Sequence, residues 1–254
     1  MENVIWVALP LIGLTGGFVS GLLGIGGGVI MLPLLTFIGK VPLKLATGTD
    51  LVHVFIVATT GMLSYFRKGM VDLKAGLIIG IAGVAGGFIG SFICISLSSH
   101  FLQLLYLFVI GLAIALLFIP LKLEDENYEK GNFNKPFGIS IGFGVGSLAG
   151  LLGVGGGFII IPFMIYFLKI PLRVAIGTSL LIILISSIGT IGAKFGVGHI
   201  NLFITLLVIS GSVIGALIGA HVSRKTNVVF LRLILLSLLI TILITVGYKT
   251  ITMP

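Results

Sequence analysis

The sequence predicts an all-α, polytopic membrane protein that is built from two inverted repeats. Three observations lead to this fold class: a shortage of charged residues, a surplus of glycine, and an internal duplication. Only 9% of the 254 residues are charged and the mean hydropathy is +1.30, whereas an ordinary globular domain has about 25% charged residues. Seven charged residues cluster between residues 122 and 135, so the rest of the chain is too apolar for a soluble enzyme or a nucleic-acid-binding protein.

Glycine accounts for 38 of the 254 residues, about twice its average usage. This surplus indicates either close packing of helices or unwound backbone inside the membrane. The formal net charge of +8 is interpreted as a marker of loop topology rather than as a phosphate-binding face. The single cysteine, Cys94, excludes a disulfide framework and a cysteine-based metal cluster, and we expect neither a metal nor a cofactor.

The internal duplication is the strongest of the three observations, because the chain overlays on itself without a gap when Gly21 is placed on Gly150. In this register, Gly21–Pro33 falls on Gly150–Pro162 with 9 of 13 identical, and Pro42–Thr49 falls on Pro171–Thr178 with 5 of 8 identical. The predicted organisation is a first transmembrane repeat, a charged cytoplasmic linker and a second transmembrane repeat, at residues 1–121, 122–136 and 137–254. Duplication with interrupted apolar segments in matching positions is typical of secondary transporters.

Each half contains five apolar stretches, which we interpret as helices. In chain order they are 4–23, 29–38, 45–66, 75–97 and 101–121, then 137–152, 158–167, 174–195, 202–222 and 228–248. Three stretches in each half approach the roughly 20 residues that a spanning helix needs. The second stretch has only about 10 residues, or about 15 Å as a helix. Each half is therefore expected to combine a re-entrant or broken helix pair with three spanning helices.

The distribution of lysine and arginine distinguishes two topologies. If residues 4–38 form one broken spanning helix, the two halves are parallel and the 15 basic residues divide 8 against 7 between the two sides. If residues 4–38 form a re-entrant hairpin, the halves are inverted and the basic residues divide 11 against 4. Because cytoplasmic loops carry an excess of positive charge, we predict inverted repeats, with both termini outside and the linker in the cytoplasm.

The glycine-rich turns are the first candidate site. In a re-entrant hairpin the tip lies near mid-membrane, and inversion brings the second tip there from the other side. Short helices that begin near Val29 and Phe158 would point their unpaired N–H groups at this centre, and such glycine-rich helix starts bind anions. The alternative is that these glycines only let helices pack closely. The candidate anion-binding residues are Gly24, Gly26, Gly27, Gly28, Gly153, Gly155, Gly156 and Gly157.

A second duplicated pattern, Ala46–Asp50 and Ala175–Ser179, adds hydroxyl groups. We expect Gly48 and Gly177 to interrupt the helix and the residues after them to begin a second inward-facing helix. The hydroxyls would bind the anion, or they would simply cap the helices. The candidates for this role are Thr49, Thr178 and Ser179.

Asp50 and His53 are an ionisable pair spaced i and i+3 in an apolar segment. An acid at membrane depth is costly and indicates a function, and a histidine changes charge near neutral pH. A carboxylate beside an anion site would repel the substrate, so we assign the pair to proton coupling. The alternative is a capping aspartate beside a packed histidine. No spacing supplies a nucleophile with a base, and an enzyme is not expected.

At Gly21–Pro33, Ala46–His53 and their copies, the sequence resembles the TauE/SafE family of membrane proteins, also called sulfite exporters or the toluenesulfonate uptake permease family. Both halves carry these patterns, so the resemblance covers nearly the whole chain. It implies transport of small sulfur-containing anions such as sulfite, sulfoacetate and other organosulfonates. The motif positions carried over are Gly24, Gly26, Gly27, Gly28, Thr49, Asp50, Gly153, Gly155, Gly156, Gly157, Thr178 and Ser179.

We therefore expect a multi-pass secondary transporter of the inner (plasma) membrane, which exports sulfite or a small organosulfonate by alternating access. The proton gradient would drive export, with Asp50 or His53 titrating. The alternative is a permease for another small anion, such as a carboxylate, sulfate or thiosulfate. The expected partners are the anion and membrane lipids, with no nucleic acid, and the sequence leaves a homodimer open.

Overall fold

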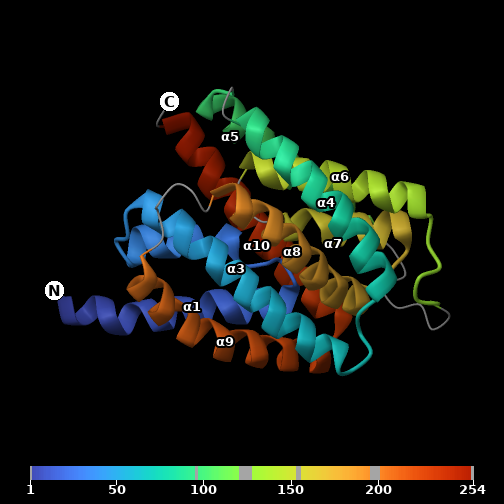
Figure 1. Ribbon diagram of the computed structural model, residues 1–254, viewed down its shortest axis with the longest axis horizontal. Coiled ribbons are helices and arrows are strands. Elements are labelled where there is room, and N and C mark those ends of the chain that lie inside the picture. Colours follow the sequence, from blue (N-terminus) through green and yellow to red (C-terminus); the bar gives the residue numbers. More distant parts are fainter. Residues whose placement is uncertain (1, 95–96, 120–127, 153–155, 195–200, 253–254) are drawn as a thin grey trace.

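The computed structural model describes residues 2–94, 97–119, 128–152, 156–194 and 201–252, and every regular element in these ranges is a helix (Figure 1). The first half contains α1 (Glu2–Leu23), α2 (Gly28–Pro33), a π-helical turn η1 (Leu34–Ile38), α3 (Leu43–Phe66), α4 (Leu73–Cys94) and α5 (Ser99–Phe118). The second half contains α6 (Lys135–Leu152), α7 (Gly157–Leu168), α8 (Leu172–Lys194), α9 (Leu202–Lys225) and α10 (Val228–Thr252). The all-α prediction is confirmed.

Five helical segments in the described part of the chain are long and apolar enough to cross a membrane. They are Gly48–Phe66, Leu73–Ile93, Phe101–Phe118, Leu202–Lys225 and Val228–Tyr248. Several large apolar side chains on these helices point outward, and Phe88, Phe92 and Phe108 are each more than half exposed. Such outward apolar faces are typical of helices surrounded by lipid, and the chain is a multi-pass membrane protein.

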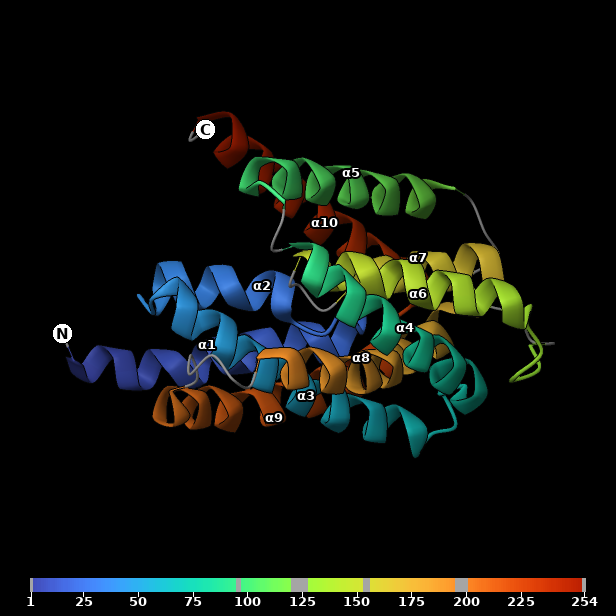
Figure 2. The same ribbon diagram turned by 45° about the horizontal axis from the view of Figure 1, so that its top comes forward.

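The helices of the two halves pack in pairs that are unchanged when the halves are exchanged. Helix α1 lies along α9, and α4 lies along α6; in the register of the duplication, α1 corresponds to α6 and α9 to α4. Figure 2 shows both pairs side by side. The contacts are backbone to backbone: a Cβ atom at Gly17 would overlap the Ser212 carbonyl oxygen, and one at Gly146 would overlap the Gly83 carbonyl oxygen. Much of the glycine surplus therefore lets helices pack closely.

The counterpart helices α3 and α8 run in opposite directions. Near the start of α3, the Thr49 hydroxyl lies 3.3 Å from the Thr205 hydroxyl in the first turn of α9. Near its end, the Ser64 carbonyl accepts a 2.7 Å hydrogen bond from Arg224 in the last turn of α9. Helix α8 instead begins at the far end of α9, where Arg173 donates to the Arg224 carbonyl at 2.8 Å. Inverted repeats require this antiparallel course, and the side of the membrane that each end faces stays a prediction.

The helix breaks occur at the glycine-rich turns and not at the second pattern. Gly24, Gly26 and Gly27 have φ values of 71°, 81° and 82°, which favour glycine, and α2 and α7 begin next to the predicted starts. Helices α3 and α8 continue through Gly48 and Gly177, so the predicted interruption there is wrong. A helix tolerates an internal glycine at a cost of about 1 kcal/mol, and a Cβ atom at Gly177 would overlap the carbonyl oxygen of Met70.

The described part of the linker is attached to the start of α4. The Asp72 carboxylate caps α4 by accepting from the Ala75 N–H at 2.9 Å, and it also accepts from the Tyr128 hydroxyl and the Gly131 N–H, each at 2.6 Å. Burial and the neighbouring carboxylate raise the pKa of the Tyr128 phenol above its ordinary value. The start of α1 and the end of α10 lie at the left of Figure 1, and the 128–134 segment lies at the opposite end.

Candidate functional site

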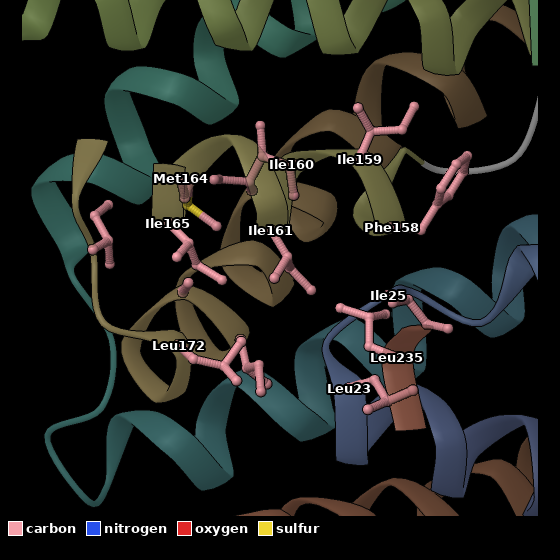
Figure 3. Packing of buried hydrophobic residues seen from close by; sticks show 14 of the residues in the cluster. Leu23, Ile25, Phe158, Ile159, Ile160, Ile161, Met164, Ile165, Leu172 and Leu235 are labelled. Atoms are coloured by element: carbon pink, nitrogen blue, oxygen red, sulfur yellow. The ribbon is translucent and has the colours of Figure 1, made fainter. Parts of the chain in front are cut away.

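The two glycine-rich turns meet in the buried centre of the molecule. A Cβ atom at Gly157 would overlap the carbonyl oxygen of Ile25, so the two chains touch at the backbone. The side chain of Ile183 on α8 lies against both turns, 3.0 Å from a Cβ position at Gly26 and 2.6 Å from one at Gly157. Figure 3 shows Ile25 within the surrounding apolar core, together with Phe158 at the start of α7.

The two short helices begin with the same backbone geometry. Gly27 and Gly156, which are counterparts in the register of the duplication, are both left-handed N-cap residues with φ of 82° and 64°. The Gly27 carbonyl accepts hydrogen bonds from residues 30 and 31, and the Gly156 carbonyl accepts them from residues 159 and 160. The structure thus brings Gly24–Gly28 together with Gly156 and Gly157, while Gly153 and Gly155 lie outside the described residues.

Behind the second turn lies a narrow crevice between α3, α4, α6 and α8. It consists of two adjoining cavities of about 30 and 20 Å³, which share Gly83, Gly146, Ala149, Ile183 and Ser186 in their walls. Asp50 lines one cavity and Gly156 lines the other. A volume of this size holds about one or two water molecules, so the crevice is closed to an oxyanion in this conformation.

Behind the first turn, the corresponding space is filled by a histidine. The His53 imidazole is fully buried, and its Nδ1 lies 2.7 Å from Oγ of Ser212 on α9. Its Nε2 faces the first turn, 2.7 Å from a Cβ position at Gly27, and the Cβ of Ser20 lies 3.6 Å from that same position. Nε2 of His53 and Oγ of Ser20 have no hydrogen-bond partner among the described residues.

The polar residues of this compartment have apolar counterparts in the second half. The register of the duplication pairs His53 with Ile182, Ser20 with Ala149, and Ser212 with Gly83. All three counterparts line the smaller cavity. The starts of α2 and α7 therefore share a left-handed N-cap and differ in the side chains around it.

The three predicted hydroxyl ligands make contacts with protein groups. Ser179 donates to the carbonyl of Gly24 at 2.7 Å, which attaches the first turn to α8. Thr178 accepts from the backbone N–H of Asp72 at 2.9 Å, and Thr49 lies against Thr205. Thr178 thus contacts the residue that precedes α4, and Thr49 contacts the N-terminal end of α9. Neither threonine lines the crevice.

Ser20, Ser212 and Ser186 were not predicted from the sequence. A signal for the first two was present, because each is a hydroxyl residue where its duplicate is Ala149 or Gly83. A position that is polar in one repeat and apolar in the other therefore indicates a residue that distinguishes the two halves. In the part of the chain that the structure describes, no group of three or more His, Cys, Asp or Glu residues could hold a metal ion.

Comparison with known proteins gives one family match and several relatives. The family model described as "Sulfite exporter TauE/SafE" matches residues 9–246. The chain is 29% identical over 258 residues to the probable membrane transporter protein YunE of Bacillus subtilis, an alignment that covers 91% of this chain and 94% of YunE. It is also 29% identical over 258 residues to the probable membrane transporter protein MJ0441 of Methanocaldococcus jannaschii, with 94% and 95% covered. No solved structure matches the chain.

Proposed function

The chain belongs to the sulfite exporter TauE/SafE family, and on this premise we propose that it exports sulfite or a small organosulfonate across the plasma membrane by alternating access. The observation that carries the proposal is the meeting of two duplicated glycine-rich turns at the buried centre. In secondary transporters built from repeats, the substrate site lies at the repeat interface, among broken helices. The relatives named above carry the word transporter in their names.

We propose that the two halves are inverted in the membrane, with both termini outside and the linker in the cytoplasm. The antiparallel course of α3 and α8 supports this proposal, and so does the position of the start of α1 and the end of α10 opposite residues 128–134 (Figure 1). Rocking of one half against the other would then open the centre to each side in turn.

The crevice behind the second turn is the proposed path of the anion. It reaches Gly156 at the start of α7, a helix of 12 residues. The first N–H groups of such a helix, with about half a positive charge, attract an anion. Ser186 adds a hydroxyl to the wall, and Asp50 lines the other cavity. The crevice must widen to admit sulfite, as alternating access requires.

Proton coupling completes the proposal, with Asp50 or His53 as the carrier. Both are buried, and they stand one turn apart on α3. An ionisable residue at this depth is costly and indicates a function. Other small oxyanions or carboxylates are the alternative cargo, and competition of each with labelled sulfite would separate these possibilities.

Uptake of labelled sulfite by proteoliposomes tests the path. A Cβ atom at Gly83 would lie 3.5 Å from the Gly142 carbonyl oxygen and 3.7 Å from Ser186 Cβ, so Gly83→Ala fits the helix contact but narrows the crevice. We expect a several-fold loss of transport at unchanged thermal stability. Gly144→Ala is the matched control, because nothing lies within 4 Å of its Cβ position. Full transport by Gly83→Ala would remove the crevice as the path.

A further inference from the structure

Two buried polar atoms behind the first turn are unexplained by the fold. Nε2 of His53 and Oγ of Ser20 are buried without a hydrogen-bond partner among the described residues, although the great majority of buried polar atoms in proteins have one. In the second half, α7 begins with the same left-handed N-cap as α2, and Ile182 and Ala149 stand at these positions. Since the backbone does not require the polar residues, their cost to stability indicates a role in function.

The hydrogen bonds of Ser212 determine which imidazole nitrogen carries the proton. Oγ of Ser212 lies 2.7 Å from the carbonyl oxygen of Val208, and two oxygens at this distance need a proton between them. Ser212 therefore donates to Val208 and can only accept from Nδ1 of His53, 2.7 Å away. We assign the neutral tautomer with a proton on Nδ1, which leaves a lone pair on Nε2.

Among the described residues that lie next to the His53 imidazole, none is charged. Helix α1 contributes Gly16 and Ser20, the first turn contributes Gly27, and α9 contributes Ser212 to the imidazole. The nearest titratable residue along α3 is Asp50, one turn earlier, which lines the crevice. Nε2 is thus a single proton-accepting atom, and Gly27 provides the space beside it.

We propose that Nε2 of His53 takes up the coupled proton, that Ser212 orients the ring so that only Nε2 receives it, and that Ser20 accepts a hydrogen bond from the protonated nitrogen. The step forms one N–H bond with a proton from one aqueous side and breaks it on the other. A cation in an apolar compartment is stable only beside an opposite charge, so protonation of His53 and binding of the anion favour each other. The proton and the anion then cross in the same direction, so the outward gradient of the anion, and not the inward proton gradient expected from the sequence, drives export. This inference rests on the proposed transport function and chooses His53 over Asp50.

Transport measurements separate the proton step from anion transport. In proteoliposomes, His53→Gln should lose accumulation of labelled sulfite driven by a pH gradient, while exchange of labelled for unlabelled sulfite without a gradient continues. Ser212→Ala and Ser20→Ala should weaken the pH response several-fold. Ser223→Ala is the matched control, because Ser223 is a fully buried serine nearer the end of the same helix, α9. Accumulation by His53→Gln at the wild-type level would overturn the inference and leave the transport function standing.

A spectroscopic measurement tests the proton site independently of transport. The protein has four histidines, so a variant with His100→Gln, His199→Gln and His221→Gln retains His53 alone. Its ¹⁵N-labelled imidazole should show a protonated Nδ1 and an unprotonated Nε2, and sulfite should promote protonation of Nε2 as the pH falls. A ring protonated on Nε2 alone, or an Nε2 that sulfite does not affect, would contradict the assignment. If wild-type protein transports no sulfite, the proposed function fails while the tautomer can still be read.

Discussion

Behind the first glycine turn lies an imidazole with two hydroxyl residues, whereas behind the second turn an isoleucine, an alanine and a glycine leave a cavity of about 20 Å³. The short helices α2 and α7 both begin with a left-handed N-cap, at Gly27 and Gly156. The comparison shows that the two short helices begin alike, while a few side chains around their starts differ between the halves. We infer that the first half of the chain binds the proton and that the second half admits the anion.

The largest expected effect tests whether the helix pairs α1–α9 and α4–α6 are packed equally closely. Gly17 and Gly146 are counterparts, and a Cβ atom at either would overlap a backbone carbonyl of the neighbouring helix. Alanine at each position should therefore lower the free energy of unfolding by about 3 kcal/mol, the upper range for overpacking. Denaturation by SDS in mixed micelles measures both variants. Equal decreases in the free energy of unfolding would support equally close packing of the two helix pairs. A much smaller decrease at one position would show that one helix pair is more loosely packed.

A smaller effect should distinguish the caps of α4 and α9, where the halves differ. Asp72 accepts from Ala75, Tyr128 and Gly131, whereas its counterpart Asn201 accepts only from the first turn of its own helix in the contacts described. Asp72→Ala should cost about 2–3 kcal/mol, because a cap and hydrogen bonds to a charged group are lost. Asn201→Ala should cost about 1 kcal/mol. The same denaturation assay compares them, and equal costs would mean that the linker contacts contribute nothing.

The next effect concerns the turns themselves. Alanine at a left-handed position costs about 1–2 kcal/mol, so both Gly27→Ala and Gly156→Ala should be destabilised. At Gly27 the added methyl would also press on His53, 2.7 Å from Nε2, whereas at Gly156 the nearest atom is Ala149 Cβ at 3.0 Å. We expect thermal unfolding in detergent to show the larger drop for Gly27→Ala. A larger drop for Gly156→Ala would contradict the assignment of the filled compartment to the first half.

Features that depend on residues close together in the sequence could be predicted, whereas features that depend on contacts between distant residues could not. The breaks at Gly24–Gly27 and before α7 were predictable, because glycine clusters recur at matching positions beside apolar stretches of half the usual length. The interruptions predicted at Gly48 and Gly177 were wrong. At Gly177 a neighbouring chain packs against the glycine, and such a glycine looks the same in sequence as one that breaks a helix. The partners of His53 were missed because Ser20 lies on α1 and Ser212 on α9, far from α3 along the chain, and only tertiary packing brings them together.

The smallest expected effect is a pH dependence at the contact between the linker and the start of α4, where the Tyr128 phenol donates to Asp72 at 2.6 Å. Burial and the carboxylate raise the pKa of this phenol in the folded state, against an ordinary value of about 10. Below that pH the phenol is protonated in both states and its contribution to stability is complete. Above it, the unfolded chain releases its proton first, so the stability falls as the pH rises. The difference in melting temperature between wild type and Tyr128→Phe should therefore shrink between about pH 9 and 11. A constant difference across this range would show that the phenol is not held by Asp72.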